Sequence, residues 1–282
     1  MRTLTRSARW PRAVGQQAPT YAAYGVLLSL LVQAACSSPS ETGAPADAVP
    51  PPIASHLWSD GFGGNGSDEV SAVAVDGEAE VTAVGDFGRT AEFGGPSFVT
   101  EPAHRDIFVA HYTADGEHIW SRAVGGDYFN YGCAVASLTD GSVVVTADGA
   151  PGIDLGGGAL ASGATTIAKL SRADGSHIWS KDFPDAPTHG CSHVAASGSG
   201  IVIAGTARGG AADFGGELLE PISGLGTDVY TVRLSADGDH LWSRRFGGTE
   251  GARAHGIAAA GTSEFIVVGA FQGTITSRRL AG

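Results

Sequence analysis

The sequence has few charged residues and only one methionine. Asp, Glu, Lys and Arg together make up 16% of its 282 residues, whereas glycine occurs 43 times. Glycine weakens a helix by roughly 1 kcal/mol at each interior position, so this chain is poorly suited to long helices. Short strands joined by tight turns suit the composition better, and it therefore favours an all-β fold.

The apolar run near the N-terminus is too short to cross a bilayer as a helix, which takes about 20 residues. It covers residues 21–32, and this length fits the apolar core of a signal peptide. Four arginines and no acidic residue precede it. The run closes on Gln33-Ala34-Ala35-Cys36-Ser37.

Two small residues before a cysteine resemble the lipobox of bacterial lipoproteins, in which the cysteine is acylated and becomes the new N-terminus. Leucine usually occupies the position of Gln33, and an ordinary secretory signal is the alternative. The resemblance implies a signal peptide at residues 1–35, lipidation at Cys36 and attachment to a bacterial envelope membrane. Ser37 favours the outer membrane. Residues 36–54, rich in Pro, Ser and Ala, are then a tether between anchor and folded domain.

Basic residues are scarce compared with acidic ones. The chain has 17 Lys and Arg against 29 Asp and Glu, and loss of the four leader arginines takes its formal charge from −12 to −16. Such a surface repels phosphate backbones, so nucleic acid is not an expected partner. The lipid anchor, rather than electrostatic attraction, would hold the protein at a membrane.

One four-residue motif, His-(Ile/Leu)-Trp-Ser, occurs four times. Its tryptophans are 62, 59 and 63 residues apart, and they are Trp58, Trp120, Trp179 and Trp242. An internal repeat of this length indicates a repeat architecture.

Each repeat contains four strand signals in the same order. A run of small apolar residues comes first, as at 70–75, and a β-branched run follows, as at 143–146. The third strand, such as residues 228–234, is joined to the Trp strand by an Ala-Asp-Gly turn, a strong hairpin signal. An insert before the third strand carries an acid, a large apolar residue and two glycines, as in Asp213-Phe214-Gly215-Gly216.

The repeat length favours a β-propeller blade. Four strands with short turns need about 40 residues, which leaves about 20 for the insert. A sandwich unit needs about 100 residues and a leucine-rich repeat 20–29. The small residues of the first strand suit the crowded centre of a ring, and the Trp strand is expected to lie outermost.

The combination Trp-Ser-x-x-(Phe/Val)-Gly-Gly, Asp-Gly, (Asp/Glu)-Phe-Gly-Gly and Asp-x-(Phe/Tyr) resembles the SBBP-type β-propeller repeat of secreted and lipid-anchored bacterial proteins. The resemblance covers about residues 55–276. We expect a repeat domain at residues 55–282, with three complete blades, an outer strand at 55–63 and two inner strands of a fourth copy. These terminal pieces either close the ring or leave it incomplete, and the pattern favours an incomplete ring.

Motifs for catalysis or metal binding are absent. The chain has no calcium loop of the D-x-[DN]-x-[DN]-G type and no G-x-S-x-G elbow. The motif histidines His56, His118, His177 and His240 recur once per blade, too far apart to share a metal ion. We therefore predict no metal site, no cofactor and no catalytic residue.

Cys133 and Cys191 occupy equivalent places on neighbouring first strands. Such strands should lie about 8–10 Å apart, beyond the roughly 7 Å between Cα atoms that a disulfide tolerates. We predict buried free thiols.

Residues that differ between the repeats are the candidates for a binding site, because a specific site should break the repeat. They are His104, Tyr128, Asn130, His189, His193, Arg253 and His255, several of them near the start of a first strand. The sequence thus predicts a non-enzymatic, lipid-anchored envelope protein whose propeller binds a protein or glycan. The alternative is a quinoprotein-like propeller, either an enzyme or an outer-membrane assembly factor, because Gly-x-His-Ile-Trp also resembles the repeats of that class.

Overall fold

The computed structural model describes residues 25–26, 56–125, 129–149, 151–161, 165–186, 188, 190–198, 200–222, 226–248, 250–261 and 264–278. The predicted signal peptide and tether, with Cys36, lie outside these residues except for 25–26, and so do Tyr128 and His189. The described residues are all-β, as predicted, and none of them forms a helix, so none forms one that could span a membrane.

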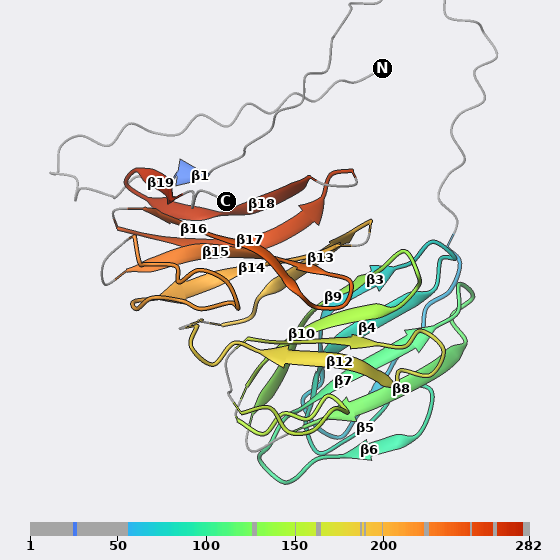
Figure 1. Ribbon diagram of the computed structural model, residues 1–282. Coiled ribbons are helices and arrows are strands. Elements are labelled where there is room, and N and C mark those ends of the chain that lie inside the picture. Colours follow the sequence, from blue (N-terminus) through green and yellow to red (C-terminus); the bar gives the residue numbers. More distant parts are fainter. Residues whose placement is uncertain are drawn as a thin grey trace, which may run out of the picture.

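Three antiparallel sheets follow one another along the chain (Figure 1). Sheet 1 has the order β3-β4-β7-β8, with the bounds Glu69–Val75, Val81–Phe87, Asp106–Tyr112 and His118–Val124. Sheet 2 consists of β9 (Asn130–Ser137), β10 (Val143–Gly149), β11 (Thr166–Leu170) and β12 (His177–Asp182). Sheet 3 consists of β13 (His193–Ser197), β14 (Gly200–Arg208), β15 (Thr227–Ser235) and β16 (His240–Gly248).

The fourth repeat forms a terminal hairpin, β17 (Gly251–Ala259) and β18 (Phe265–Gln272), as expected for two inner strands. A two-residue strand, β1 (Gly25–Val26), pairs with the other edge of β18. The last strand, β19 (Ile275–Arg278), pairs with β16 and adds a fifth strand to sheet 3. The described residues do not close into a ring of sheets.

The prediction of an outer strand at residues 55–63 is wrong. Residues 56–62 form no strand, and only β2 (Gly63–Gly64) pairs with β5 (Thr90–Glu92), which pairs with β6 (Ser97–Val99) of the first insert. The outer strand of a four-stranded blade pairs with the third strand of that blade. Beside β18, where the third strand would lie, the described residues place only the two-residue β1.

The first strands of the sheets lie next to one another, as their small residues predicted. β3 contacts β9, β9 contacts β13, and β13 contacts β17. The Trp strands β8 and β12 lie at the opposite edges of sheets 1 and 2, whereas β16 is covered by β19. The small side chains of β9 and β13 therefore lie where neighbouring sheets approach most closely.

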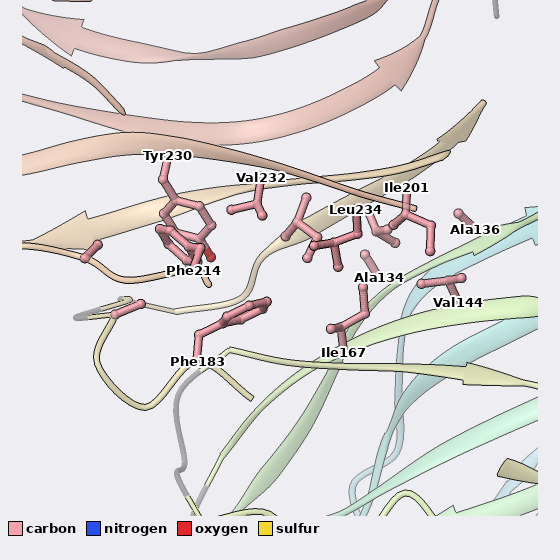
Figure 2. Packing of buried hydrophobic residues seen from close by; sticks show 14 of the residues in the cluster. Ala134, Ala136, Val144, Ile167, Phe183, Ile201, Phe214, Tyr230, Val232 and Leu234 are labelled. Atoms are coloured by element: carbon pink, nitrogen blue, oxygen red, sulfur yellow. The ribbon is translucent and has the colours of Figure 1, made fainter. Parts of the chain in front are cut away.

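The core lies between successive sheets. Figure 2 shows the cluster between sheets 2 and 3, where Val144 and Ile167 from one sheet face Ile201 and Leu234 from the other. The large residue of each insert is buried in the core, as predicted, and these residues are Phe93, Leu155 and Phe214. Removing this much apolar surface from water is the main stabilising contribution to the stacking of the sheets.

Three of the four motif tryptophans each bond to a hairpin turn of the following repeat. The indole N–H groups of Trp58, Trp120 and Trp179 donate to the carbonyls of Ala114, Arg172 and Ala236, at 3.0, 2.7 and 3.1 Å. All three carbonyls belong to hairpin turns that lead into the next Trp strand. In the turn between β11 and β12, which contains Arg172, Gly175 has a φ of 67°. A Cβ on Gly175 would lie 2.6 Å from Cε3 of Trp120. Glycine thus serves the turn and also makes room for the indole.

The motif histidines are half-buried in the three complete repeats. Nε2 of His118 is 3.0 Å from the Ser121 hydroxyl, and His177 makes the same contact with Ser180. Each ring covers the Gly-Gly pair of its own insert, so closely that a Cβ on Gly157 would lie 2.4 Å from Cε1 of His177. Of the four motif histidines, only His56 is exposed.

Cys133 and Cys191 form a disulfide, so the prediction of free thiols is wrong. Their Cα atoms are 5.2 Å apart. Cys133 lies within β9, but Cys191 precedes β13, which begins at His193. Because Cys191 is outside the ladder, its backbone can approach β9 more closely than two first strands approach each other.

Candidate functional site

The described candidate residues form two groups at the starts of the first strands. His104 precedes Arg105 in the chain, just before β7, and Asn130, the first residue of β9, donates to the carbonyl of Arg105. His193, Arg253 and His255 lie on β13 and β17. That these residues belong to a binding site stays a prediction, and the structure shows only where they lie.

Arg105 is at the centre of the first group. Its guanidinium forms an ion pair with Asp86, and its carbonyl accepts hydrogen bonds from the backbone N–H and the side-chain amide of Asn130, at 3.0 and 3.3 Å. Asp86 pairs with Glu69 across the ladder. Burial raises the pKa of Asp86 and Arg105 lowers it, with a net upward shift to which Glu69 contributes. The side-chain oxygen of Asn130 is buried without a hydrogen-bond partner.

Two exposed aromatic side chains flank Asn130, and neither is among the candidates predicted from the sequence. Phe129 and Tyr131 are 49% and 41% exposed, and their rings are nearly parallel, with centroids 6.5 Å apart and planes at 8°. Phe129 forms a β-bridge with Arg105, and Tyr131 pairs with Asp148 of β10. We call Phe129, Tyr131, Arg105, Asp86 and Glu69 the aromatic rim. The signal in the sequence was an aromatic residue at alternate positions around Asn130.

The second group lies beside a cavity of about 420 Å³ between the start of β17 and the end of β18. Arg253, His255 and Glu250 line it, so it offers both signs of charge. His193 is close enough to His255 to be affected by its charge. Burial is the larger cause that lowers the pKa of His193, and His255 lowers it further.

A hydroxyl, an imidazole and a carboxylate also line up between sheets 1 and 2. The Thr82 hydroxyl is 2.8 Å from Nδ1 of His111, and Nε2 of His111 is 3.0 Å from Glu80. Thr82 and His111 are 0% and 1% exposed, so no substrate reaches the hydroxyl. Arg172 of sheet 2 donates to Glu80 at 2.7 Å and thereby lowers the pKa of that carboxyl. Glu80 thus links His111 of sheet 1 to Arg172 of sheet 2, and we assign the three-residue arrangement a structural role rather than a catalytic one.

The three motif histidines of the complete repeats belong to different sheets, and His56 lies outside the sheets. No three His, Cys, Asp or Glu side chains among the described residues are grouped so as to hold a metal ion. Neither the protein-family models nor the curated proteins compared with the chain match it.

Proposed function

We propose that this protein is a non-catalytic, lipid-anchored envelope protein of β-propeller type that binds a glycan at its aromatic rim. The observation that carries the proposal is the exposed, parallel pair of Phe129 and Tyr131. Apolar faces of sugar rings pack on aromatic rings, and their hydroxyls bond to charged groups such as Arg105 and Glu69.

Several features support the proposal that this is an exported protein of β-propeller type with a neutral ligand. Each complete repeat contributes four strands to its sheet, and the small-residue strands of neighbouring sheets adjoin. The Trp strands of sheets 1 and 2 lie at the outer edges, which suits consecutive propeller blades. The disulfide between Cys133 and Cys191 suits the oxidising conditions of an exported protein. The formal net charge is −12 for the full sequence and −16 without the four leader arginines. It opposes binding of polyanions, which favours a neutral glycan.

The test is binding of the detergent-solubilised full chain to an array of neutral oligosaccharides. We expect the double substitution Phe129→Ala and Tyr131→Ala to weaken binding about tenfold or more, equivalent to at least about 1.4 kcal/mol. The matched control is Ile178→Ala with Leu241→Ala, which removes two side chains of similar exposure, 49% and 54%, from β12 and β16.

Two outcomes would refute the glycan assignment. One is that the wild-type protein binds no glycan and instead retains an envelope protein through the same two aromatic residues. The other is equal binding by the rim variant and the control. The anchor is tested separately by labelling with a fatty-acid probe, which should mark the wild-type chain and not Cys36→Ser.

A further inference from the structure

Three valines of β3 are exposed at the beginning of the repeat array. Val70, Val73 and Val75 are 60%, 62% and 61% exposed. We call them the start face. Val73 pairs with Ala83, as Val135 pairs with Val145 and Val194 with Ile203. At these equivalent positions Val135 and Val194 are only 6% and 7% exposed, because the preceding sheet covers them.

The terminal hairpin exposes a second apolar face. Ile266 and Val268 of β18, which we call the end face, are 42% and 38% exposed. Ile266 is opposite Ala258, as Val144 is opposite Ala136 in sheet 2, and Val144 is fully buried against sheet 3. The counterpart of Val268 in sheet 1 is Val84, which is fully buried between sheets 1 and 2.

The start face and the end face are therefore the two halves of the interface that the chain forms between its own sheets. Repeat arrays remain separate when their terminal repeats carry polar outer surfaces, and both faces here are apolar instead. Within one chain the two faces remain exposed and do not cover each other.

We propose that copies of this protein associate head to tail, with the end face of one copy packed on the start face of the next. The second copy is the chosen occupant because this contact continues an interface already formed between consecutive sheets of the chain. Such a contact joins different surfaces of the two partners, so it can add further copies or close into a ring of copies.

Sedimentation velocity of the full chain in density-matched detergent tests the proposal. We expect the mass of the wild-type protein to rise with concentration beyond that of a dimer. Val73→Glu and Ile266→Glu should each remain monomeric, with at least a tenfold weaker association, because each destroys one face. Leu241→Glu changes an exposed side chain of β16 outside both faces and should associate like the wild type.

Mixing the two monomeric variants gives the decisive result. Each variant retains the face that the other has lost, so an equimolar mixture should form dimers and nothing larger. Circular dichroism checks that both variants keep the wild-type fold. A wild-type protein that stays monomeric at every concentration, a Val73→Glu protein that still associates, or a mixture that stays monomeric would each overturn the proposal.

Discussion

The middle of the repeat array and its two ends contain the same residue types in different environments. Val135 and Val194 are buried between sheets, whereas Val73, at the equivalent position of β3, is 62% exposed. The three residues have similar neighbours along the chain, so the difference in burial comes from the adjacent sheet. A pattern of apolar residues thus indicates which face of a strand can be buried, and the fold decides which of those faces is covered.

The motif tryptophans also differ between the middle of the array and its end. Trp120 is nearly buried and donates to the carbonyl of Arg172 in the next sheet. Trp242 instead lines an apolar cavity of about 350 Å³ beside the terminal hairpin, with the Arg244 guanidinium 5.2 Å from its ring centroid. Among the described residues, no carbonyl accepts a hydrogen bond from its indole. Among the described residues, the tryptophan contact between repeats is therefore made by Trp120 and not by Trp242.

The largest effect on stability is expected from removal of the disulfide between Cys133 and Cys191 in the middle of the array. The disulfide closes a loop with a sequence separation of 58 residues, and removing it should lower the free energy of unfolding by about 4 kcal/mol. Denaturant titration of the wild type with and without reductant measures the loss. The variant Cys133→Ala with Cys191→Ala should match the reduced protein and show no further response to reductant. Equal stability of oxidised and reduced wild type would contradict this expectation.

A smaller difference is expected between equivalent valines. Val135→Ala removes two buried methyl groups and should destabilise the protein by about 2 kcal/mol. Val73→Ala should change stability by less than about 0.5 kcal/mol, because Val73 is largely exposed. Thermal and denaturant unfolding at low protein concentration compare the two variants. If both lose the same stability, the start face is covered within the single chain.

The features that could be predicted from the sequence are those that recur locally. The Asp-Gly hairpins, the four-strand repeat and the buried insert residues follow from turn chemistry and residue pattern, and they are confirmed at Gly116, Gly175 and Phe214. In contrast, the disulfide depends on how closely one segment outside the ladder approaches a strand 58 residues away. The spacing between these two segments cannot be predicted from the residue pattern of either segment alone.

The candidate site shows the same limit. The differences between repeats pointed to Asn130. Its side chain is fully buried and donates a hydrogen bond to the carbonyl of Arg105. The exposed groups are its neighbours Phe129 and Tyr131, because side chains alternate between the two sides of a strand. The residue predicted from the sequence is thus adjacent to the proposed rim, and only the strand register shows which side chains face solvent.

The smallest effect tests the contact between repeats without creating a large cavity. Trp120→Phe keeps an aromatic ring but loses the indole N–H, so the hydrogen bond to the Arg172 carbonyl disappears at a cost of about 1 kcal/mol. Trp242→Phe is the matched control and should change stability by less than half of that, since its indole makes no such bond to a described residue. Equilibrium unfolding in urea, with the change in midpoint compared at a common slope, resolves the two. Equal losses in both variants would mean that the tryptophans contribute through ring packing alone, and the interior and the end of the array would then differ in burial but not in this hydrogen bond.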